Sequence, residues 1–375
     1  MSIQFIWLLS VALLNIIAGV YYEIRPNDRF RFVIGDIPLK LKQKSIYSFL
    51  LIISLVFISI NTTNIPDIEV YQLIYSGGVN SVEIGYAFLQ NIFKFLNCDF
   101  YLFRAFVIIA SFILFYYGLN NIGFNTQIAF SLYLFFPLEY DVIQLRNFLS
   151  FSIVLFGLHY IFDETNYGKL KYIIFVLIAA SIHLMSIIYI ILIFANSDIF
   201  KQKWKRQLLL LVFFVTLLGS IIFKNNNYIQ LLLTNIFQFV NSSKATVYLK
   251  NKVGLGYIYF WLMQLFLLVS SYFLKKGYEK TNEFKIKESK TTTQLFWINI
   301  LISCTLPLCI LNVNFYRIFR NLLIVNYCQL GLFSGLTNNK YKTIGLFIFI
   351  IGYIYILKYN LAINTNDIIS PFFGL

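Results

Sequence analysis

Long apolar stretches, separated by short polar or basic connections, run along almost the whole chain. A helix that is apolar on every side suits a bilayer, which accepts such a surface where water does not. Several stretches are shorter than the roughly 20 residues that a straight spanning helix needs. The pattern predicts hydrophobic segments at about 3–22, 45–60, 102–119, 127–140, 147–162, 170–196, 206–223, 255–274, 294–312, 318–334 and 343–360.

The stretch 170–196 allows two interpretations. If the stretch is one long tilted helix, the basic residues that follow it, Lys201 to Arg206, would lie on the external side. Two shorter helices with a break near His183 keep these charges inside, together with the later basic loops. We prefer the broken form. The expected fold is all-α: a polytopic membrane protein of about 11–12 transmembrane segments, forming a single integral membrane domain over residues 1–375.

Charged loops give these segments a direction. The loop after the first segment is basic and should be cytoplasmic, which places the N-terminus outside. Its basic residues are Arg25, Arg29, Arg31, Lys40, Lys42 and Lys44. The next loop, 61–101, is mainly acidic and suits the external side. The first segment lacks basic residues ahead of it and a convincing cleavage site, so we expect a retained helix rather than a signal peptide.

Two external stretches have the spacing of amphipathic helices. Residues 82–96 repeat apolar side chains along one side of a helix: Ile84, Phe88, Ile92 and Phe95. Residues 228–240 are similar. Each is expected either to lie flat in the membrane interface or to pack as a re-entrant piece over a cavity.

Composition agrees with a membrane protein and narrows the chemistry. Hydrophobic residues make up 59% of the chain and charged residues 12%, against about 25% charged in soluble domains. We assign the net charge of +14 to orientation of loops rather than to nucleic acid. The four cysteines form no disulfide or metal pattern. No nucleotide loop or metal-ligand motif is present, so no cofactor and no metal are expected.

Arginines near the expected external face are the first candidates for a site. Arg146 stands in a very short turn between two apolar segments, where a charge is costly unless paired or hydrated, which favours function. The alternative is a snorkelling side chain paired with Asp141 or Glu139. Arg317 and Arg320 stand three residues apart, on one helical face, and can bind phosphate oxygens or anchor the helix at the interface.

Other polar residues join them on the same side. His183 is either a packed histidine or one that binds phosphate or moves a proton, whereas His159 is expected to be packing. Asp67 is a candidate base or sugar-hydroxyl acceptor, or the cap of a helix. Tyr71 and Tyr75 follow on the same helical face, where they suit sugar rings or the ordinary interfacial belt.

Taken in order, the motifs of residues 60–330 resemble the EpsG-like branch of the Wzy polysaccharide polymerases. The motifs are D-x3-Y-x3-Y (Asp67, Tyr71, Tyr75), E-x-G-Y (Glu83, Gly85, Tyr86), Arg146-Asn147 at the start of an apolar helix, A-x3-H-x2-S (Ala179, His183, Ser186) and the Arg317 region. The resemblance implies a glycosyltransferase that joins oligosaccharide repeat units on undecaprenyl diphosphate, outside the bacterial plasma membrane, without a nucleotide sugar.

The resemblance also implies roles for the candidate residues. Arg146, Arg317 and Arg320 would stabilise the anionic diphosphate that leaves. Asp67, Glu83 and His183 are the candidate proton acceptors; we expect an acidic residue as the base and His183 near the diphosphate. Tyr71, Tyr75 and Asp141 would bind substrate.

The partners that the resemblance implies are the lipid-linked glycan, as both donor and acceptor, a flippase and a chain-length regulator. Membrane lipid is also expected, and nucleic acid is not. The alternatives are another lipid-linked glycosyltransferase or ligase, or a flippase of lipid-linked oligosaccharide. Charge gathered at one face favours catalysis over transport.

Overall fold

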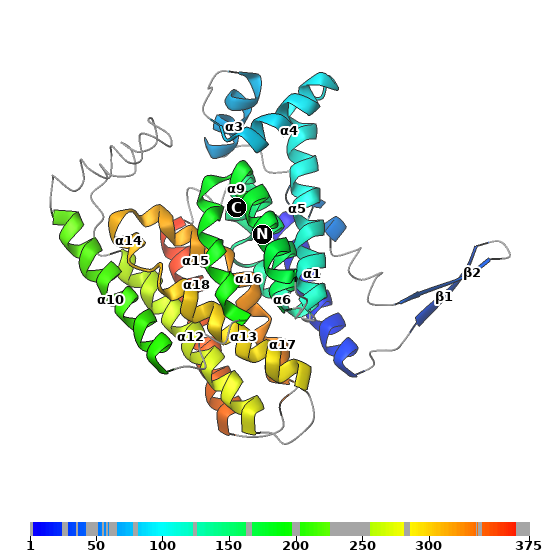
Figure 1. Cartoon of the computed structure of the whole chain (residues 1–375). Coiled ribbons are helices and arrows are strands. Elements are labelled where there is room, and N and C mark those ends of the chain that lie inside the picture. Colours follow the sequence, from blue (N-terminus) through cyan, green and yellow to red (C-terminus); the bar gives the residue numbers. More distant parts are fainter. Residues whose placement is uncertain are drawn as a thin grey trace. The chain divides into compact units, whose positions relative to one another are not determined.

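The computed structural model describes most of the chain, and its described part is almost entirely helical (Figure 1). This confirms the all-α class. The described residues are 3–24, 29–34, 37–42, 52–54, 56–57, 59, 66–77, 82–122, 126–162, 167–196, 203–225, 256–280, 286–334, 336 and 340–364. The predicted stretch 228–240 lies outside them, and 45–60 lies only partly within them.

The elements follow one another in a fixed order from blue to red in Figure 1. They are α1 (Ile3–Ile24), β1 (Arg29–Ile34), β2 (Ile37–Lys42), α3 (Pro66–Ser76), α4 (Ile84–Phe95), α5 (Phe100–Ile122), α6 (Thr126–Tyr133), α7 (Leu138–Ile143), α8 (Leu145–Phe162), α9 (Gly168–Ile182), η1 (Leu184–Asn196), α10 (Lys203–Asn225), α12 (Tyr257–Lys280), α13 (Ile286–Ser303), α14 (Leu308–Leu311), η3 (Val313–Tyr316), α15 (Arg317–Asn321), α16 (Leu323–Tyr327), α17 (Gln329–Ser334) and α18 (Lys340–Asn364).

Five helices in the described part of the chain are long and apolar enough to cross a membrane. They are Phe100–Ile122, Leu145–Phe162, Tyr257–Lys280, Ser289–Ile310 and Lys340–Asn360. Shorter apolar helices accompany them, including Ile6–Gly19 and Phe213–Ile222. The chain is therefore a multi-pass membrane protein.

Several apolar stretches are interrupted rather than continuous. The stretch 127–140 forms α6, a turn and α7, and Pro137 precedes α7. Pro307 precedes α14 in the same way. Proline has no backbone N–H for the preceding turn and its ring crowds that turn, so a helix tends to end before it. The stretch 318–334 is similarly divided, into the short helices α15, α16 and α17.

The break that we predicted near His183 is confirmed. Helix α9 ends at Ile182, and His183 has an extended backbone with φ −146° and ψ 109°. The Tyr172 hydroxyl of α9 donates to the carbonyl of Tyr189 in η1, at 2.8 Å. This bond joins residues on both sides of the break, so the beginning of η1 folds back along α9 instead of extending it.

One element was not predicted. Strands β1 and β2 pair antiparallel in the basic loop after α1, with Arg29 opposite Lys42. The segment RFRF alternates charged and aromatic residues with period two, which is the pattern of a strand. That alternation is the local signal from which the hairpin could have been predicted.

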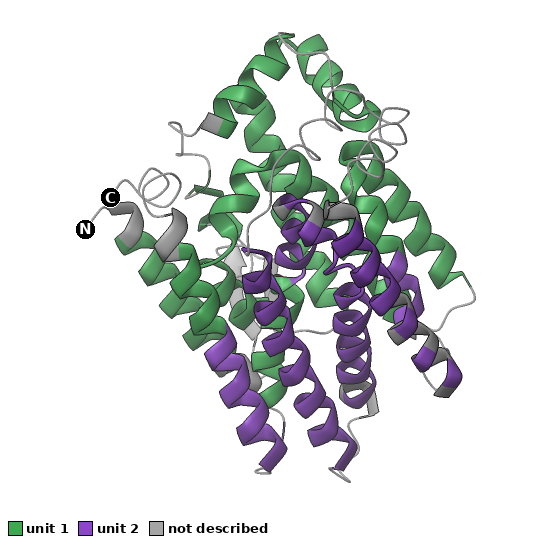
Figure 2. Cartoon of the chain, turned by 90° about the vertical axis from the view of Figure 1, so that its left-hand side faces the viewer, with its two compact units in different colours: residues 1–190, 323–335, 353–375 green, residues 191–322, 336–352 purple. Residues whose placement is uncertain are grey.

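The chain divides into two compact units, coloured in Figure 2. Unit 1 comprises residues 1–190, 323–335 and 353–375; in it α5 packs on α8, α8 on α9, and α1 on α6. Its centre is aromatic: Phe115 contacts both Phe148 and Phe151 across α5 and α8. Unit 2 comprises residues 191–322 and 336–352, and in it α12 packs on α13.

Candidate active site

Arg146 forms a buried ion pair at the start of α8. Its Nη1 donates to Oε2 of Glu83 at 2.6 Å, and the two side chains are only 14% and 13% exposed. Glu83 has an extended backbone immediately before α4. The expected alternative, a pairing of Arg146 with Asp141 or Glu139, is wrong: the partner of Arg146 is Glu83. Removing one member of such a pair strands a charge and costs about 3–5 kcal/mol.

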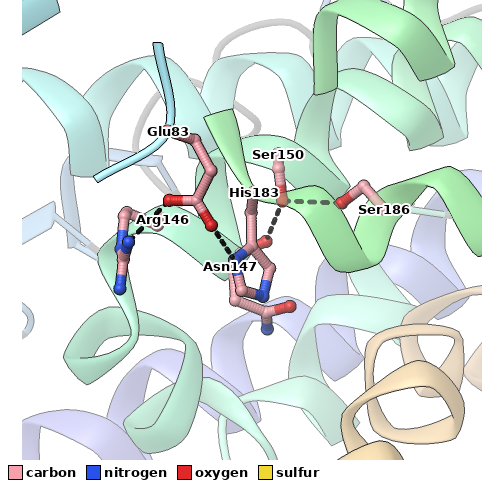
Figure 3. A network of polar contacts seen from close by, with 6 residues as sticks. All are labelled: Glu83, Arg146, Asn147, Ser150, His183 and Ser186. Atoms are coloured by element: carbon pink, nitrogen blue, oxygen red, sulfur yellow. Dashed lines mark hydrogen bonds and ion pairs between the residues drawn. The ribbon is translucent and has the colours of Figure 1, made fainter. Parts of the chain in front are cut away.

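His183 extends this pair into a three-residue network (Figure 3). Its Nδ1 lies 3.6 Å from Oε1 of Glu83, so the carboxylate stands between the imidazole and the guanidinium. The break at His183 places the ring here, because the extended residue turns away from the axis of α9. The site thus joins the start of α4, the start of α8 and the end of α9.

The residues of the A-x3-H-x2-S motif build this break. The His183 N–H donates to the Ala179 carbonyl at 2.9 Å, and the Ser186 N–H donates to the His183 carbonyl at 2.9 Å. The Ser186 hydroxyl also donates to Ser150 at 2.9 Å, and Ser150 donates to the Asn147 carbonyl at 3.0 Å. Backbone groups of Ala179, His183 and Ser186 therefore have partners at the break, and the Ser186 side chain ties it to α8.

Gly85 lets α4 approach α9 closely enough for Glu83 to reach His183. A Cβ at Gly85 would overlap Oγ of Ser181 and lie 2.9 Å from the Ser181 carbonyl oxygen. The second atom belongs to the backbone and cannot rotate away. The E-x-G-Y motif thus has a glycine at position 85 because α4 packs there directly against Ser181, two residues before His183.

A Gly85→Ala variant should therefore lose both stability and activity. We expect a destabilisation of about 1–3 kcal/mol from overpacking, with a larger fractional loss of activity because Glu83 is displaced from His183. Thermal unfolding and a turnover assay measure the two effects. Gly256→Ala is the matched control, since nothing lies within 4 Å of a Cβ there. Wild-type behaviour of Gly85→Ala would contradict this account.

Tyrosine rings surround the Arg146 guanidinium. Its Cζ lies 5.6 Å from the ring centroid of Tyr71 and 5.9 Å from that of Tyr86. The two rings meet edge to face at 6.4 Å. Cations over aromatic faces gain electrostatic stabilisation that grows when water is excluded. Tyr71 therefore lies in the Arg146 network, and its role in binding substrate stays a prediction.

The neighbours of Tyr71 in the D-x3-Y-x3-Y motif lie differently. The Tyr75 hydroxyl donates to the Cys98 carbonyl at 2.8 Å, and its ring stacks on Phe103 at 5.2 Å. Burial, and then the charges of Cys98 and Asp99, raise the pKa of Tyr75. Asp67 lies on α3. The structure thus brings Tyr71, but not Asp67 or Tyr75, into the Arg146 network.

Asp141 and Glu139 each have buried polar partners of their own in unit 1. Tyr133 donates to Asp141 at 2.8 Å, and Asn360 donates to Glu139 at 2.6 Å. Tyr140 in turn donates to Asn360 at 3.1 Å. Both carboxylates are buried.

Arg317 and Arg320 lie on α15, in unit 2. Arg320 is fully buried; its Nη1 donates to the Tyr316 hydroxyl at 3.0 Å, and its Cζ lies 5.4 Å from the Tyr316 ring. Tyr316 stacks on Phe260 at 4.6 Å. Arg317 is half-buried. The two arginines thus belong to a different unit from the Arg146 network.

Two further residues were not among the predicted site residues, although the sequence carries a signal for each. Arg104 lies inside the apolar stretch 102–119, is buried, and donates to the Ser59 carbonyl at 3.0 Å. A charge inside a span is itself a signal of function. Tyr86 was noted only as part of a motif, yet it lies beside Arg146. Among the described residues, no group of His, Cys, Asp and Glu side chains could hold a metal ion.

The network lies at the ends of α8 and α9 that are remote from their connection. Arg146 is roughly 24 Å from Phe162 along α8, and His183 is roughly 22 Å from Gly168 along α9, at 1.5 Å per residue. Both residues therefore stand almost a full helix length away from the residues that connect α8 to α9.

Comparison with known protein families gives a match over most of the chain. Residues 44–373, most of the chain, match the EpsG family. A search of curated proteins and a search of solved structures each return no match.

Proposed function

The chain belongs to the EpsG family, and from this we propose that it joins undecaprenyl-diphosphate-linked oligosaccharide repeat units into a polysaccharide. Family membership supports a Wzy-like polysaccharide polymerase, a glycosyltransferase of polysaccharide biosynthesis. The finer proposal concerns the donor: the growing glycan carries a lipid diphosphate, which is the leaving group. The acceptor is a sugar hydroxyl of the next lipid-linked unit.

The observation that carries the proposal is the arrangement of Arg146, Glu83 and His183. A glycosyl transfer from a diphosphate needs a cation for the charge that develops on the leaving group and an acceptor for the hydroxyl proton. In the proposal Arg146 is the cation, and the Glu83–His183 pair is the proton acceptor. All three lie in one buried network. Both requirements are met by side chains of a single unit.

In this mechanism we propose that His183 is the base that accepts the proton of the acceptor hydroxyl. The acceptor oxygen bonds to the anomeric carbon, the bond from that carbon to the diphosphate oxygen breaks, and the hydroxyl proton passes to the imidazole. Glu83 stands beside the ring nitrogen and stabilises the imidazolium that forms. Glu83 is already held by Arg146, so its second oxygen is positioned to orient His183. This reverses the expectation that an acidic residue is the base.

The other candidate residues take supporting roles in the proposal. Tyr71, against the guanidinium, is placed to contact a sugar or phosphate group. Asp67 and Tyr75 on α3 are proposed to contact the glycan further from the reacting atoms. Asp141 is proposed to bind substrate from its position beside Tyr133. Arg317 and Arg320 are proposed as a phosphate-binding pair on unit 2, argued from their charge alone.

Orientation and partners are also part of the proposal. Positively charged loops favour a cytoplasmic position for the connections that follow α1 and α12, and an external position for the α3–α4 region. The reaction then takes place at the outer face of the bacterial plasma membrane. A flippase would supply the lipid-linked units, and a chain-length regulator would act on the product.

Reconstitution tests this function directly. Purified full-length protein in proteoliposomes, given undecaprenyl-diphosphate repeat units, should yield a ladder of longer glycans on a gel. A single addition to a different acceptor, without a ladder, would identify a ligase or another transferase. Transfer of units between leaflets without any chain growth would identify a flippase. Either of these results would overturn the proposed polymerase.

A further inference from the structure

The side chain of Tyr86 is a fully buried polar group without a hydrogen-bond partner in the described part of the chain. Its exposed fraction is 0%, and its hydroxyl is among the buried polar atoms with no partner. The ring is held at its edge by Phe103, at 5.6 Å, and by Tyr71, at 6.4 Å. Burying a hydroxyl without a partner costs free energy, so such groups in native proteins call for an explanation.

A second buried donor lies beside it. Among the described residues, Nε of Arg146 has no hydrogen-bond partner, although Nη1 of the same guanidinium is bound to Glu83. The guanidinium carbon lies 5.9 Å from the centroid of the Tyr86 ring. An arginine Nε–H donates and never accepts. The Tyr86 hydroxyl can both donate and accept, so an oxygen that accepts from Arg146 can also accept from this hydroxyl.

The Tyr86 hydroxyl keeps its proton in this environment. Burial raises the pKa of Tyr86 well above its usual value; Tyr71 adds to the rise, Arg146 opposes it, and Glu83 adds to it again. The hydroxyl therefore acts as a neutral donor rather than as a phenolate. A neutral donor next to a cation matches an anionic oxygen better than it matches another donor.

We propose that Tyr86 binds the diphosphate of the lipid-linked substrate, by donating its hydroxyl hydrogen bond to a phosphate oxygen that Arg146 also contacts. This inference rests on the proposed function and adds a binding residue to it. The ring of Tyr86 packs against Phe103 and Tyr71, so the position of its hydroxyl oxygen is set by these contacts. Its role is to bind and position the diphosphate, whereas His183 remains the residue that accepts the proton.

The Tyr86→Phe variant isolates the hydroxyl, because the ring and its packing are kept. The full-length protein in nanodiscs is titrated with inorganic diphosphate and, separately, with undecaprenyl diphosphate. We expect the dissociation constant to rise about tenfold or more, as for loss of a hydrogen bond to a charged group. The melting temperature should stay the same or rise, since an unsatisfied buried hydroxyl is removed.

Tyr353→Phe is the matched control. Its hydroxyl donates to the Leu132 carbonyl at 3.0 Å, so the same substitution there removes a bond that is made. That variant should melt at a lower temperature and bind both diphosphates with unchanged affinity. A purely structural role for Tyr86 would instead make Tyr86→Phe resemble Tyr353→Phe.

The two ligands and the polymerisation assay separate the remaining outcomes. Weakened binding of both ligands, or of the lipid-linked one alone, supports the inference and tells whether the lipid is needed for recognition. Equal affinity of the variant and the wild type for each ligand overturns it, even if the wild type makes a glycan ladder. A wild type that binds diphosphate through Tyr86 but makes no ladder would overturn the polymerase and leave the binding site standing.

Discussion

An Arg146→Ala variant should polymerise lipid-linked repeat units at least about a hundredfold more slowly than the wild-type protein. Arg146 is the cation of the buried network, and in the proposed function it stabilises the charge on the departing diphosphate. In a site shielded from water, such a group has a much larger effect than it would in solvent. The rate of appearance of the first glycan products, measured at saturating donor, is the relevant quantity.

A control must separate this effect from misfolding. Alanine at position 146 leaves the Glu83 carboxylate without its cation, which costs stability. The double variant Glu83→Gln, Arg146→Gln removes both charges together, so it should recover much of the melting temperature while remaining inactive. Arg146→Lys keeps the charge but loses the planar fork, and it should retain only part of the activity. A near-normal rate in the double variant would remove Arg146 from the mechanism.

His183→Gln is expected to lower the rate by about a hundredfold to ten-thousandfold, the range for loss of a general base. Glutamine is similar in size and polar, so it can still meet Glu83 across the present 3.6 Å separation. It cannot take up the acceptor proton. Donor binding should change little, because Arg146 and its contacts remain. The loss is therefore expected in the maximal rate rather than in the donor concentration needed to reach half of it.

The second histidine of the chain provides the comparison. His159 lies on α8, where Nδ1 is 2.6 Å from the Phe156 carbonyl oxygen and the ring packs 3.8 Å from Tyr160. His159→Gln should leave the rate within about twofold, since substitutions of partly exposed residues away from a site usually have small effects and His159 lies outside the network. If the His183→Gln variant polymerised as fast as the His159→Gln variant, His183 would not be the base. The proton would then have to pass to Glu83 or Asp67.

The apolar pattern and the charges of the loops were enough to predict the class of fold and many local features. Ile84, Phe88, Ile92 and Phe95 were expected on one side of a helix, and all four are exposed along α4. The break near His183 was inferred from loop charges, and α9 ends one residue before it. These features depend on hydropathy, helical periodicity and loop charge, which can be read directly from the sequence. The interfacial position of α4 stays a prediction.

The residues of the candidate site could be predicted from the sequence only in part. Arg146, Glu83 and His183 were each singled out because charges are costly next to apolar segments, and Tyr71 because it shares a helical face with Asp67. The same reasoning also selected Asp67, Tyr75 and Asp141, which lie outside the network. Nothing local separates these groups, because the cost of a charge depends on what surrounds it in space.

The sequence by itself therefore determined that this is a multi-pass helical membrane protein, and it named the polar residues that such a protein would have to accommodate. Only the tertiary structure decided which of them meet. Arg146 pairs with Glu83, 63 residues away, rather than with nearby Asp141. The reason is geometric: Gly85 brings α4 against α9, and the break at His183 turns the ring toward the same carboxylate. Partner choice in a low-dielectric interior depends on such packing, which no local pattern contains.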